Sequence, residues 1–455
     1  MSMPAAPKKA RTSYTCSACG WSTPKWVGRC TQCGEWGTLT EASVTSGPRT
    51  AASTVTTSAT LISDVDSHIA QARATGISEF DRVLGGGLVP GAVVLLAGEP
   101  GVGKSTLLLD VAATAARSGQ RVLYVTAEES AGQVRLRAER IGALSDGLYL
   151  AAEVDLGQVL GHVDAIKPDL FILDSVQTIA STEVEGAAGG VAQVKEVASA
   201  VISVAKKRNI PTILVGHVTK DGSVAGPRTL EHLVDVVCQF EGDRHSRLRM
   251  VRAVKNRYGP TDEVGCFDLG EAGIVGLADP SGLFLSQVNM LVPGTCITVT
   301  LEGRRPLALE VQSLVVPSSL NNPRRTTSGV DSSRLAMILA VAHRHLGARL
   351  MDADIYVSTV GGARITEPAV DLAMLLAVMS AVEDKAFPVG TIALGEVGLA
   401  GELRSVQGLA RRLSEAARLG FTRAVVPANS QLNPIAGLEI LPARTVQEAL
   451  ERAHS

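Results

Sequence analysis

Residues 98–105 read GEPGVGKS, and this stretch decides the fold of the 455-residue chain. It fits the pattern G-x-x-x-x-G-K-[S/T], in which glycines let a loop turn its backbone N–H groups toward phosphates. The apolar run 92–97 before it predicts a buried strand, and residues 106–117 after it predict a helix whose N-terminus favours negative charge. The sequence therefore predicts a phosphate-binding loop between a strand and a helix.

The loop also carries side chains suited to a nucleoside triphosphate such as ATP. Lys104 is placed to reach the β and γ phosphates, and Ser105 to offer its hydroxyl to Mg²⁺. The alternative, a glycine-rich turn without a ligand, is disfavoured by the strand and helix on either side. We expect the whole run to hold the nucleotide, namely Gly98, Glu99, Pro100, Gly101, Val102, Gly103, Lys104, Ser105 and Thr106.

Apolar strands and helices alternate along the middle of the chain. Strands are predicted at 120–126, 148–150, 170–174 and 212–217, and helices at 131–141, 158–167 and 192–209. This alternation predicts a parallel, doubly wound α/β sheet, with ligands at the carboxyl ends of the strands.

Polar residues follow three of these strands. Asp174 ends an apolar strand and is expected to hold Mg²⁺; the alternative is a strand-end acid at the surface. Glu128 or Glu129 is expected to act as the base toward the attacking water, unless both are charges at a helix start. His217 is placed to sense the γ-phosphate, although a lone histidine is often only structural.

Two long polar loops follow strand ends, at residues 178–190 and 219–228. In a ring-shaped ATPase such loops line the channel and hold a nucleic-acid strand, with Lys220 and Arg228 as phosphate contacts. Residues 244–257 hold six basic residues and no acid, which predicts a strand with a solvated basic face. That face fits a nucleic-acid backbone or a neighbouring subunit's phosphate, or is merely a solvated edge.

Four cysteines near the N-terminus form two C-x-x-C pairs, each followed by a glycine: Cys16, Cys19, Cys30 and Cys33. This spacing predicts a structural Zn²⁺ site, with a redox dithiol or disulfides as the alternative. All three tryptophans lie in the same segment and are expected to pack around the metal, with a stacking platform for a base or partner as the alternative. The remaining cysteines are expected to be buried bystanders, namely Cys238, Cys266 and Cys296.

Composition predicts a globular, cytoplasmic protein without a membrane partner. The net charge is −2 and 45% of the residues are hydrophobic, so nucleic-acid binding would need a local basic surface. No apolar run reaches about 18 residues, and the N-terminus lacks an apolar secretory region. The expected domains are a zinc module (1–39), a flexible linker (40–60), the P-loop ATPase domain (61–285) and an α+β domain (286–455).

The motifs GEPGVGKST, AEES, ILDS, GHVTKDGSVAGPR and VKNRYG, together with the zinc module, resemble the RadA (Sms) family of bacterial DNA-repair ATPases. The resemblance runs from about Tyr14 to the end of the chain. It implies a RecA-like core, hexameric rings on single-stranded and branched DNA, and helicase-like branch migration during recombination with RecA.

The resemblance also assigns residue roles. It favours Glu128 over Glu129 as the base, and places the two DNA-binding loops at 178–190 and 218–228. It gives His217 the phosphate-sensing position. The run KNRYG at 255–259 corresponds to the family's KNRFG and implies coupling of ATP to DNA across subunits through Lys255, Asn256 and Arg257.

The C-terminal domain is similar to the proteolytic domain of Lon. The Ser and Lys positions of the Lon dyad fall on Ala369 and Ala410, which cannot carry out acyl transfer. The resemblance therefore implies an inactive scaffold that holds a ring together, with duplex DNA as a further ligand.

These residues are compatible with three functions. An ATP-driven DNA motor is the leading hypothesis. A nucleotide-switched ring that recruits repair partners without being a motor is the alternative. An ATP-regulated peptidase is disfavoured by the two alanines at the dyad positions.

Overall fold

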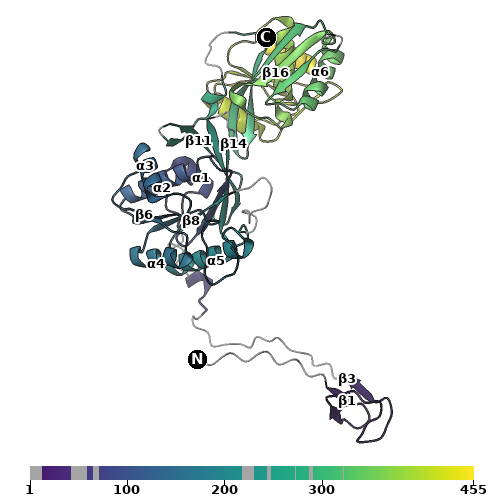
Figure 1. The fold of residues 1–455 in the computed structure, drawn as a ribbon. Helices are drawn as coiled ribbons and strands as arrows, with labels where there is room; N and C mark the ends of the chain where they lie inside the picture. Colours follow the sequence, from purple (N-terminus) through teal and green to yellow (C-terminus); the bar gives the residue numbers. More distant parts are fainter. Residues whose placement is uncertain are drawn as a thin grey trace. The chain divides into compact units, whose positions relative to one another are not determined.

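The computed structural model describes residues 13–41, 59–64, 71–217, 230–242, 247–271, 273–285, 291–320 and 322–455. The chain divides into two compact units, Met1–Asp66 and Ser67–Ser455 (Figure 1). The predicted boundary between an ATPase domain and a C-terminal domain at 285/286 falls inside the second unit and stays a prediction. In the described part of the chain, no helix is long and apolar enough to cross a membrane.

The first unit is a small antiparallel sheet with the strand order β2-β1-β3. Its strands are β1 (Tyr14–Cys16), β2 (Ser22–Thr23) and β3 (Leu39–Glu41), followed by the 3₁₀ turn η1 (Ile62–Asp64). Cys16, Cys30 and Leu39 form its buried core. Such a core is too small to fold without a further staple, which is the role expected of a metal.

The second unit contains a nine-stranded sheet with the order β12-β11-β10-β9-β4-β8-β7-β5-β6. Six neighbouring strands run parallel to one another, namely β9, β4, β8, β7, β5 and β6. The sheet continues beyond β9 with β10, β11 and β12, and each of these runs antiparallel to its neighbours. Their bounds are β4 (Val93–Gly98), β5 (Val122–Thr126), β6 (Leu148–Ala152), β7 (Leu170–Asp174), β8 (Thr212–His217), β9 (Val236–Gly242), β10 (Leu248–Asn256), β11 (Val264–Gly270) and β12 (Gly273–Gly276).

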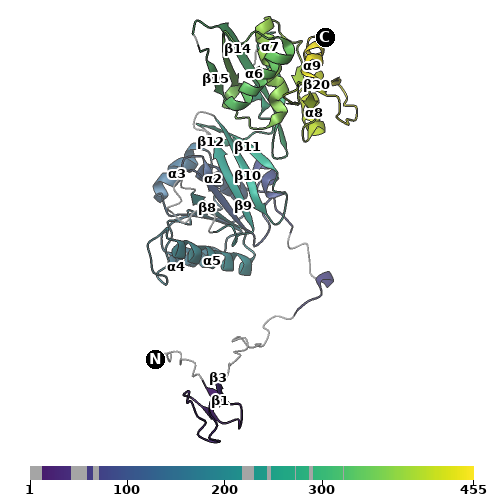
Figure 2. The same cartoon turned by 90° about the vertical axis from the view of Figure 1, so that its right-hand side faces the viewer.

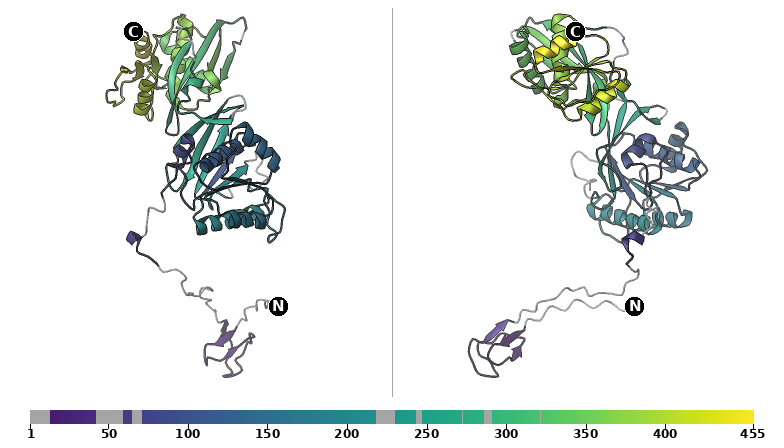
Figure 3. Two further views of the ribbon diagram at one scale, coloured as in Figure 1. Left: turned by 90° about the vertical axis from the view of Figure 1, so that its left-hand side faces the viewer. Right: turned by 180° about the vertical axis from the view of Figure 1, so that it is seen from behind.

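Helices cover both faces of this sheet (Figures 2 and 3). One face packs against α1 (Ser78–Leu84), α2 (Lys104–Arg117) and α3 (Ala131–Arg140). The other packs against α4 (Leu156–Ile166) and α5 (Val191–Arg208). Because the central strands are covered on both sides, β4, β5 and β7 are buried along their whole length, which explains their continuous apolar sequences. The predicted doubly wound α/β fold is confirmed.

The strand register brings the predicted site residues to one edge of the sheet. Gly98 at the end of β4 lies beside His217 at the end of β8. Thr126 at the end of β5 lies beside Asp174 at the end of β7. Four strands therefore deliver their carboxyl ends, and the residues that follow them, to the same edge.

The C-terminal part of the second unit has a seven-stranded mixed sheet, β15-β16-β14-β13-β17-β20-β21. One face packs against α6 (Ser332–Leu346), α7 (Asp371–Glu383) and α9 (Val446–His454), and the other against α8 (Leu409–Arg418). The strands are β13 (Thr295–Glu302), β14 (Arg305–Pro317), β15 (Arg325–Ser328), β16 (Ala353–Thr359), β17 (Thr391–Ala393), β20 (Arg423–Pro427) and β21 (Glu439–Ala443). The short hairpin of β18 (Glu396–Val397) and β19 (Leu403–Arg404) lies outside this sheet.

A buried ion pair joins the two sheets of the second unit. Arg305, at the start of β14, contacts the carboxylate of Glu79 on α1, and both side chains are buried. Arg305 also donates to the carbonyl oxygens of Leu277 and Ala278 at 2.8 Å each. Glu79 in turn accepts from the backbone N–H of Cys266 at 2.9 Å.

Candidate active site and metal centre

The phosphate-binding loop connects β4 to α2. Gly101 and Gly103 adopt φ of +79° and +110°, in the left-handed region that favours glycine. A Cβ on Gly98 would lie 2.5 Å from the carbonyl oxygen of Phe240, so a side chain cannot fit there. Helix α2 begins at Lys104, which aims the first free N–H groups of the helix into the loop.

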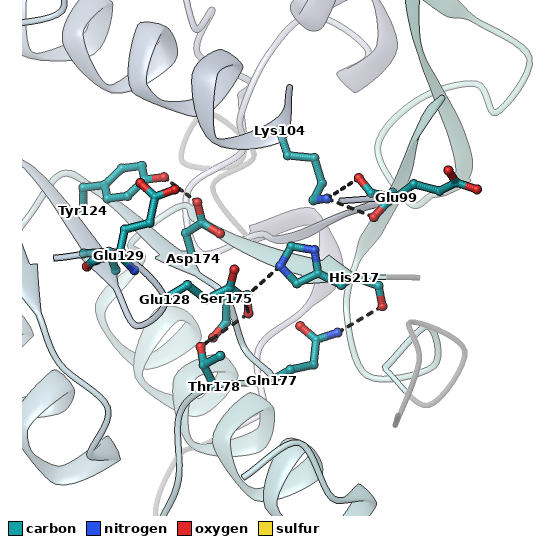
Figure 4. A network of polar contacts seen from close by, with 12 residues as sticks. Glu99, Lys104, Tyr124, Glu128, Glu129, Asp174, Ser175, Gln177, Thr178 and His217 are labelled. Carbon is teal, nitrogen blue, oxygen red and sulfur yellow. Dashed lines mark hydrogen bonds and ion pairs between the residues drawn. The ribbon is translucent and has the colours of Figure 1, made fainter. Parts of the chain in front are cut away.

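The Lys104 side chain folds back onto the phosphate-binding loop (Figure 4). Its Nζ donates to the carbonyl oxygens of Gly98 and Glu99, at 2.9 Å each. The side chain is 4% exposed. Burial lowers the pKa of the ammonium, and the nearby carboxylates Asp174 and Glu128 oppose that shift. The site thus already holds a buried cation at the place predicted for the phosphates.

Asp174 is held by a residue that the sequence reasoning missed. The Tyr124 hydroxyl, from the middle of β5, donates to Asp174 Oδ2 at 2.7 Å. Burial and then the charge of Asp174 raise the pKa of Tyr124 well above its ordinary value, so the phenol stays a donor. The Ser105 side chain acts on the same hydroxyl and opposes this rise in its pKa. A carboxylate and a hydroxyl oxygen brought together in this way fit the oxygen ligands that Mg²⁺ prefers.

Glu128 has two hydrogen-bond donors on one oxygen (Figure 4). Its Oε1 lies 2.5 Å from Ser175 Oγ and 2.8 Å from His217 Nε2. These bonds, that of His217 first, lower the pKa of Glu128 to about 2 against the opposing effect of burial. Ser175 was missed because its sequence position, after a strand-end aspartate, gives no signal of a partner in another loop.

Glu129 is engaged elsewhere. Its carboxylate forms an ion pair with Arg137 on α3, at 2.5 Å. The two adjacent acids therefore have different surroundings, because only Glu128 faces Ser175 and His217. This geometry agrees with the expectation that Glu128 is the better candidate base.

The two predicted DNA-binding loops begin next to this carboxylate. Ser175 precedes the first loop, and Thr178 Oγ1 donates to its carbonyl oxygen at 2.9 Å. Gln177 Nε2 donates to the carbonyl oxygen of His217, the residue from which the second loop starts, at 3.3 Å. The second loop itself, with Lys220 and Arg228, lies outside the described residues.

The KNRYG run, 255–259, lies at the opposite edge of the sheet from the phosphate-binding loop. Strand β9 runs parallel to β4 with Phe240 beside Gly98, so Val236 lies toward the other end. Strand β10 is antiparallel to β9 and places Asn256 beside Val236. At about 3.3 Å per residue, the run is on the order of 15 Å from Gly98. The structure therefore does not bring it to the nucleotide loop of its own chain.

The side chains of this run are held by backbone oxygens and a buried acid. Lys255 Nζ donates to the carbonyl oxygens of Glu231 and Val234, at 2.8 and 2.7 Å. The other contacts are Arg257 with the buried Asp235 at 3.0 Å, and Asn256 with the carbonyl oxygen of Leu84 at 3.2 Å. These residues thus fix the amino end of β4 and β9.

The prediction of a solvated basic strand face is wrong for β10. Arg249 is 8% exposed and donates to the carbonyl oxygen of Val102 in the phosphate-binding loop at 3.2 Å. Arg252 pairs with Glu302 at 2.8 Å. Neither face of β10 is solvated, because the face with Arg249 meets the nucleotide loop and the face with Arg252 meets the C-terminal sheet.

The four cysteines form the predicted metal site. Their sulfur atoms all lie within 4.8 Å of one another. Cys16 Sγ is 3.7 Å from Cys33 Sγ, and Cys19 Sγ is 3.6 Å from Cys30 Sγ. A tetrahedral Zn²⁺ with bonds of about 2.3 Å requires sulfurs about 3.8 Å apart, so the set fits the ion.

Each cysteine pair sits on the same kind of turn. Gly20 and Gly34 have φ of +76° and +78°, and each donates its N–H to the carbonyl oxygen four residues earlier at 2.9 Å. The contact with Thr38 and then the backbone N–H groups of residues 18 and 19 lower the pKa of the Cys16 thiol, and the N–H groups of residues 33 and 32 lower that of the Cys30 thiol. This arrangement stabilises thiolates and hence a bound cation.

The expectation that all tryptophans pack around the metal is wrong for two of them. Trp21 packs on the small core. Trp26 and Trp36 are instead 62% and 73% exposed. Their indoles therefore contribute little to the metal site.

The residues expected at the Lon dyad positions carry no reactive side chain, and an ion pair lies beside them. Glu367 accepts two hydrogen bonds of 2.6 Å each from the guanidinium of Arg412, which is buried. Glu367 Oε1 also accepts from Thr300 Oγ1 at 2.6 Å. This pair ties the segment before Ala369 to the helix that carries Ala410.

Three family models match parts of the chain. A model described as an AAA domain matches residues 63–223. One described as a rubredoxin metal binding domain matches residues 14–41, which contain the four cysteines. One described as subunit ChlI of Mg-chelatase matches residues 345–430.

One solved structure aligns with part of the chain. The KaiC-like protein of Pyrococcus horikoshii aligns over 46% of this chain and 99% of that chain, with 23% identity and a TM-score of 0.39. A likeness of this strength adds nothing to the assignment.

Curated relatives match nearly the whole chain. The DNA repair protein RadA of Mycolicibacterium smegmatis is 55% identical over 456 residues, covering 98% of this chain and 97% of that protein. The protein of the same name from Mycobacterium tuberculosis is 53% identical, covering 97% and 93%. That of Streptococcus pyogenes serotype M6 is 42% identical, covering 98% and 100%. With its P-loop ATPase domain and four-cysteine zinc module, the chain belongs to the RadA family of DNA repair proteins.

Proposed function

We propose that this chain is a DNA-dependent ATPase of recombinational DNA repair. It binds single-stranded DNA and uses ATP hydrolysis to promote branch migration and the processing of recombination intermediates with RecA. The name of its relatives supports the repair role, and the geometry around Glu128 supports the dependence on DNA.

The contact that carries the proposal is the one between Glu128 and the two loop starts. Ser175 and His217 both donate to Glu128 Oε1, at 2.5 and 2.8 Å. A DNA strand that binds the segments after these residues would shift the two donors of the catalytic carboxylate. ATP hydrolysis and DNA binding thereby act on the same atom.

The roles within the site follow from its charges. Lys104 and the N–H groups at the start of α2 bind the phosphates, and Ser105 and Asp174 would hold Mg²⁺. When bound, Mg²⁺ neutralises charge on the transferred phosphate. Glu128 accepts the proton of the attacking water, and His217 responds to the γ-phosphate.

The KNRYG run acts between subunits in this proposal. Because it lies on the order of 15 Å from the phosphate-binding loop of its own chain, Lys255 and Arg257 serve the nucleotide or the DNA of a neighbouring copy. Such an arrangement requires a neighbouring copy of the chain, and we take the assembly to be a closed ring of six. Asn256, Lys220 and Arg228 complete the DNA-binding set, and the C-terminal domain holds the ring together.

Mixing two inactive variants tests the contribution between subunits. Lys255→Ala keeps an intact phosphate-binding loop, and Glu128→Gln keeps an intact KNRYG run. If Lys255 acts on its neighbour, a mixed ring contains complete sites and hydrolyses ATP faster than either variant alone. A rate equal to the average of the two separate variants contradicts the proposal.

A nucleotide-switched ring that recruits repair partners without being a motor is the second candidate. Glu128→Gln separates the two candidates because it should bind ATP without hydrolysing it. Branch migration of a synthetic three-strand junction by this variant would support the switch. Loss of branch migration with ATP binding retained supports the motor, and Lys104→Ala should lose both.

A further inference from the structure

The zinc module presents two tryptophans at its surface. Trp26 is 62% and Trp36 is 73% exposed, whereas Trp21 packs against the buried Cys16 and Leu39. Apolar side chains exposed side by side mark interaction sites more often than singly exposed ones do. Neither the metal site nor the fold of the module explains these two rings.

The two rings converge over a glycine. A Cβ on Gly28 would lie 3.8 Å from Trp26 Cη2 and 3.8 Å from Trp36 Cζ3. Both atoms belong to the six-membered rings, so the outer parts of the two indoles flank a stretch of bare backbone. We call Trp26, Trp36 and Arg29 the tryptophan patch.

Arg29 belongs to the patch through its guanidinium. Its Cζ lies 5.7 Å from the centre of the Trp36 ring, within the range of a cation–π contact. Its Nε donates to the carbonyl oxygen of Gly34 at 2.7 Å, which fixes the side chain. The indole therefore keeps its other face for a ligand.

The surroundings of the patch favour a nucleic acid over a protein. Exposed Lys25 precedes Trp26, so two cations stand beside the rings against one neighbouring acid, Glu35. The other exposed neighbours are small or polar, such as Ser22, Thr31 and Gln32, rather than the aliphatic residues of a protein-docking core. Aromatic faces with flanking cations are what unpaired bases and their phosphates require.

We propose that the tryptophan patch stacks on unpaired bases of single-stranded DNA. The proposal rests on the proposed function in taking DNA as the ligand, and it adds a base-contacting surface separate from the two loops of the ATPase domain. The rings bind bases by their faces, so the patch recognises strands that are unpaired without selecting their sequence.

The intrinsic tryptophan fluorescence of the protein can be used to follow this patch, because all three tryptophans lie in the zinc module. Full-length protein loaded with zinc is titrated with an oligothymidylate and with an abasic oligonucleotide of equal length. Both carry the same phosphates, and only the first has bases. We expect the oligothymidylate to quench the emission and the abasic strand to leave it unchanged.

Variants separate the patch from the rest of the module. Trp26→Ala with Trp36→Ala should lose the quenching and bind the oligothymidylate about tenfold more weakly, with unchanged binding of the abasic strand. Trp21→Phe is the matched control and should keep the quenching. Zinc content of one ion per chain confirms that each variant is folded.

Anisotropy of labelled oligonucleotides, recorded in the same titrations, distinguishes the possible failures. Bound oligothymidylate without quenching, or a double variant that binds it as well as the wild type, overturns this proposal alone and leaves the patch to a protein partner. Absence of binding to either oligonucleotide overturns both this proposal and the proposed function.

Discussion

Glu128 Oε1 is the atom on which the site depends. It accepts from Ser175 Oγ at 2.5 Å and from His217 Nε2 at 2.8 Å, and its pKa is about 2. The group is therefore ionised at any pH at which the protein is folded and active. Its orientation, rather than its protonation, is what the loops can change.

Ser175→Ala removes one of these two donors, together with a longer contact of 3.4 Å to Thr178 Oγ1. The pKa of Glu128 should rise from about 2 toward its ordinary value, because a bond to the charged form is lost. We expect kcat for ATP hydrolysis to fall about tenfold, equivalent to about 1.4 kcal/mol, with KM for ATP unchanged. Thr178→Val is the control, and an equal fall in kcat there would show a general disturbance of the loop start.

The lowered pKa of Glu128 also predicts a pH dependence of stability. A carboxylate whose pKa is lowered on folding stabilises the fold above its unfolded pKa of about 4.5, and this contribution is lost as the pH falls through about 2. The stability difference between wild type and Glu128→Gln should therefore shrink between about pH 5 and pH 3. Urea denaturation measures it, and a difference independent of pH contradicts the assignment.

Tyr124→Phe leaves Asp174 Oδ2 without its buried donor. We expect a loss of about 1–3 kcal/mol in the free energy of unfolding, because the carboxylate stays buried. Tyr149→Phe, at an exposed position, should change stability by less than about 0.5 kcal/mol. Equal stabilities of the two variants in urea denaturation would contradict the role of the Tyr124–Asp174 bond.

At the scale of elements, the sequence predicted most of the fold closely. The strands predicted at 170–174 and 212–217 match β7 and β8. The helix predicted at 158–167 begins two residues earlier, at Leu156, because Asp155 caps it. Long apolar runs and cap residues are local signals, and so they fix local structure.

The predictions of side-chain surroundings failed at residues whose contact partners are distant in the sequence. Arg249 alternates with apolar residues like a solvated strand, yet it is buried against Val102, about 150 residues earlier. Tyr124, Ser175 and Gln177 were missed for the same reason. Each of them is a single polar residue in or next to a buried strand. Its contact partner depends on which strand lies beside it in the sheet, and the local sequence does not show that.

Removing zinc should unfold the small sheet alone. Its core contains little besides Cys16, Cys30 and Leu39, so the metal supplies most of its stability. Chelation, or Cys16→Ser, should shift tryptophan emission to the red while the thermal unfolding of the second unit stays unchanged. Metal analysis should give one zinc per chain, and unchanged emission after its removal would contradict a structural role.

At the scale of the whole molecule, the Glu79–Arg305 pair joins the ATPase sheet to the C-terminal sheet of the second unit. Arg305→Met should destabilise the chain by about 3–5 kcal/mol, because Glu79 then stays buried without a partner. Glu79→Leu combined with Arg305→Met should recover most of that loss. Urea denaturation measures it, and strictly additive effects of the two substitutions would mean that the residues are not coupled.

In the proposed function, DNA acts on the catalytic carboxylate through the residues at which the two loops begin. The most direct test is the rate of ATP hydrolysis at saturating ATP and Mg²⁺, with and without single-stranded DNA, for the wild type and Glu128→Gln side by side. We predict that DNA accelerates hydrolysis by the wild type, and that Glu128→Gln is at least about 100-fold slower in both conditions while still binding ATP. A wild-type rate that DNA leaves unchanged, or a Glu128→Gln variant that hydrolyses ATP normally, would contradict the account.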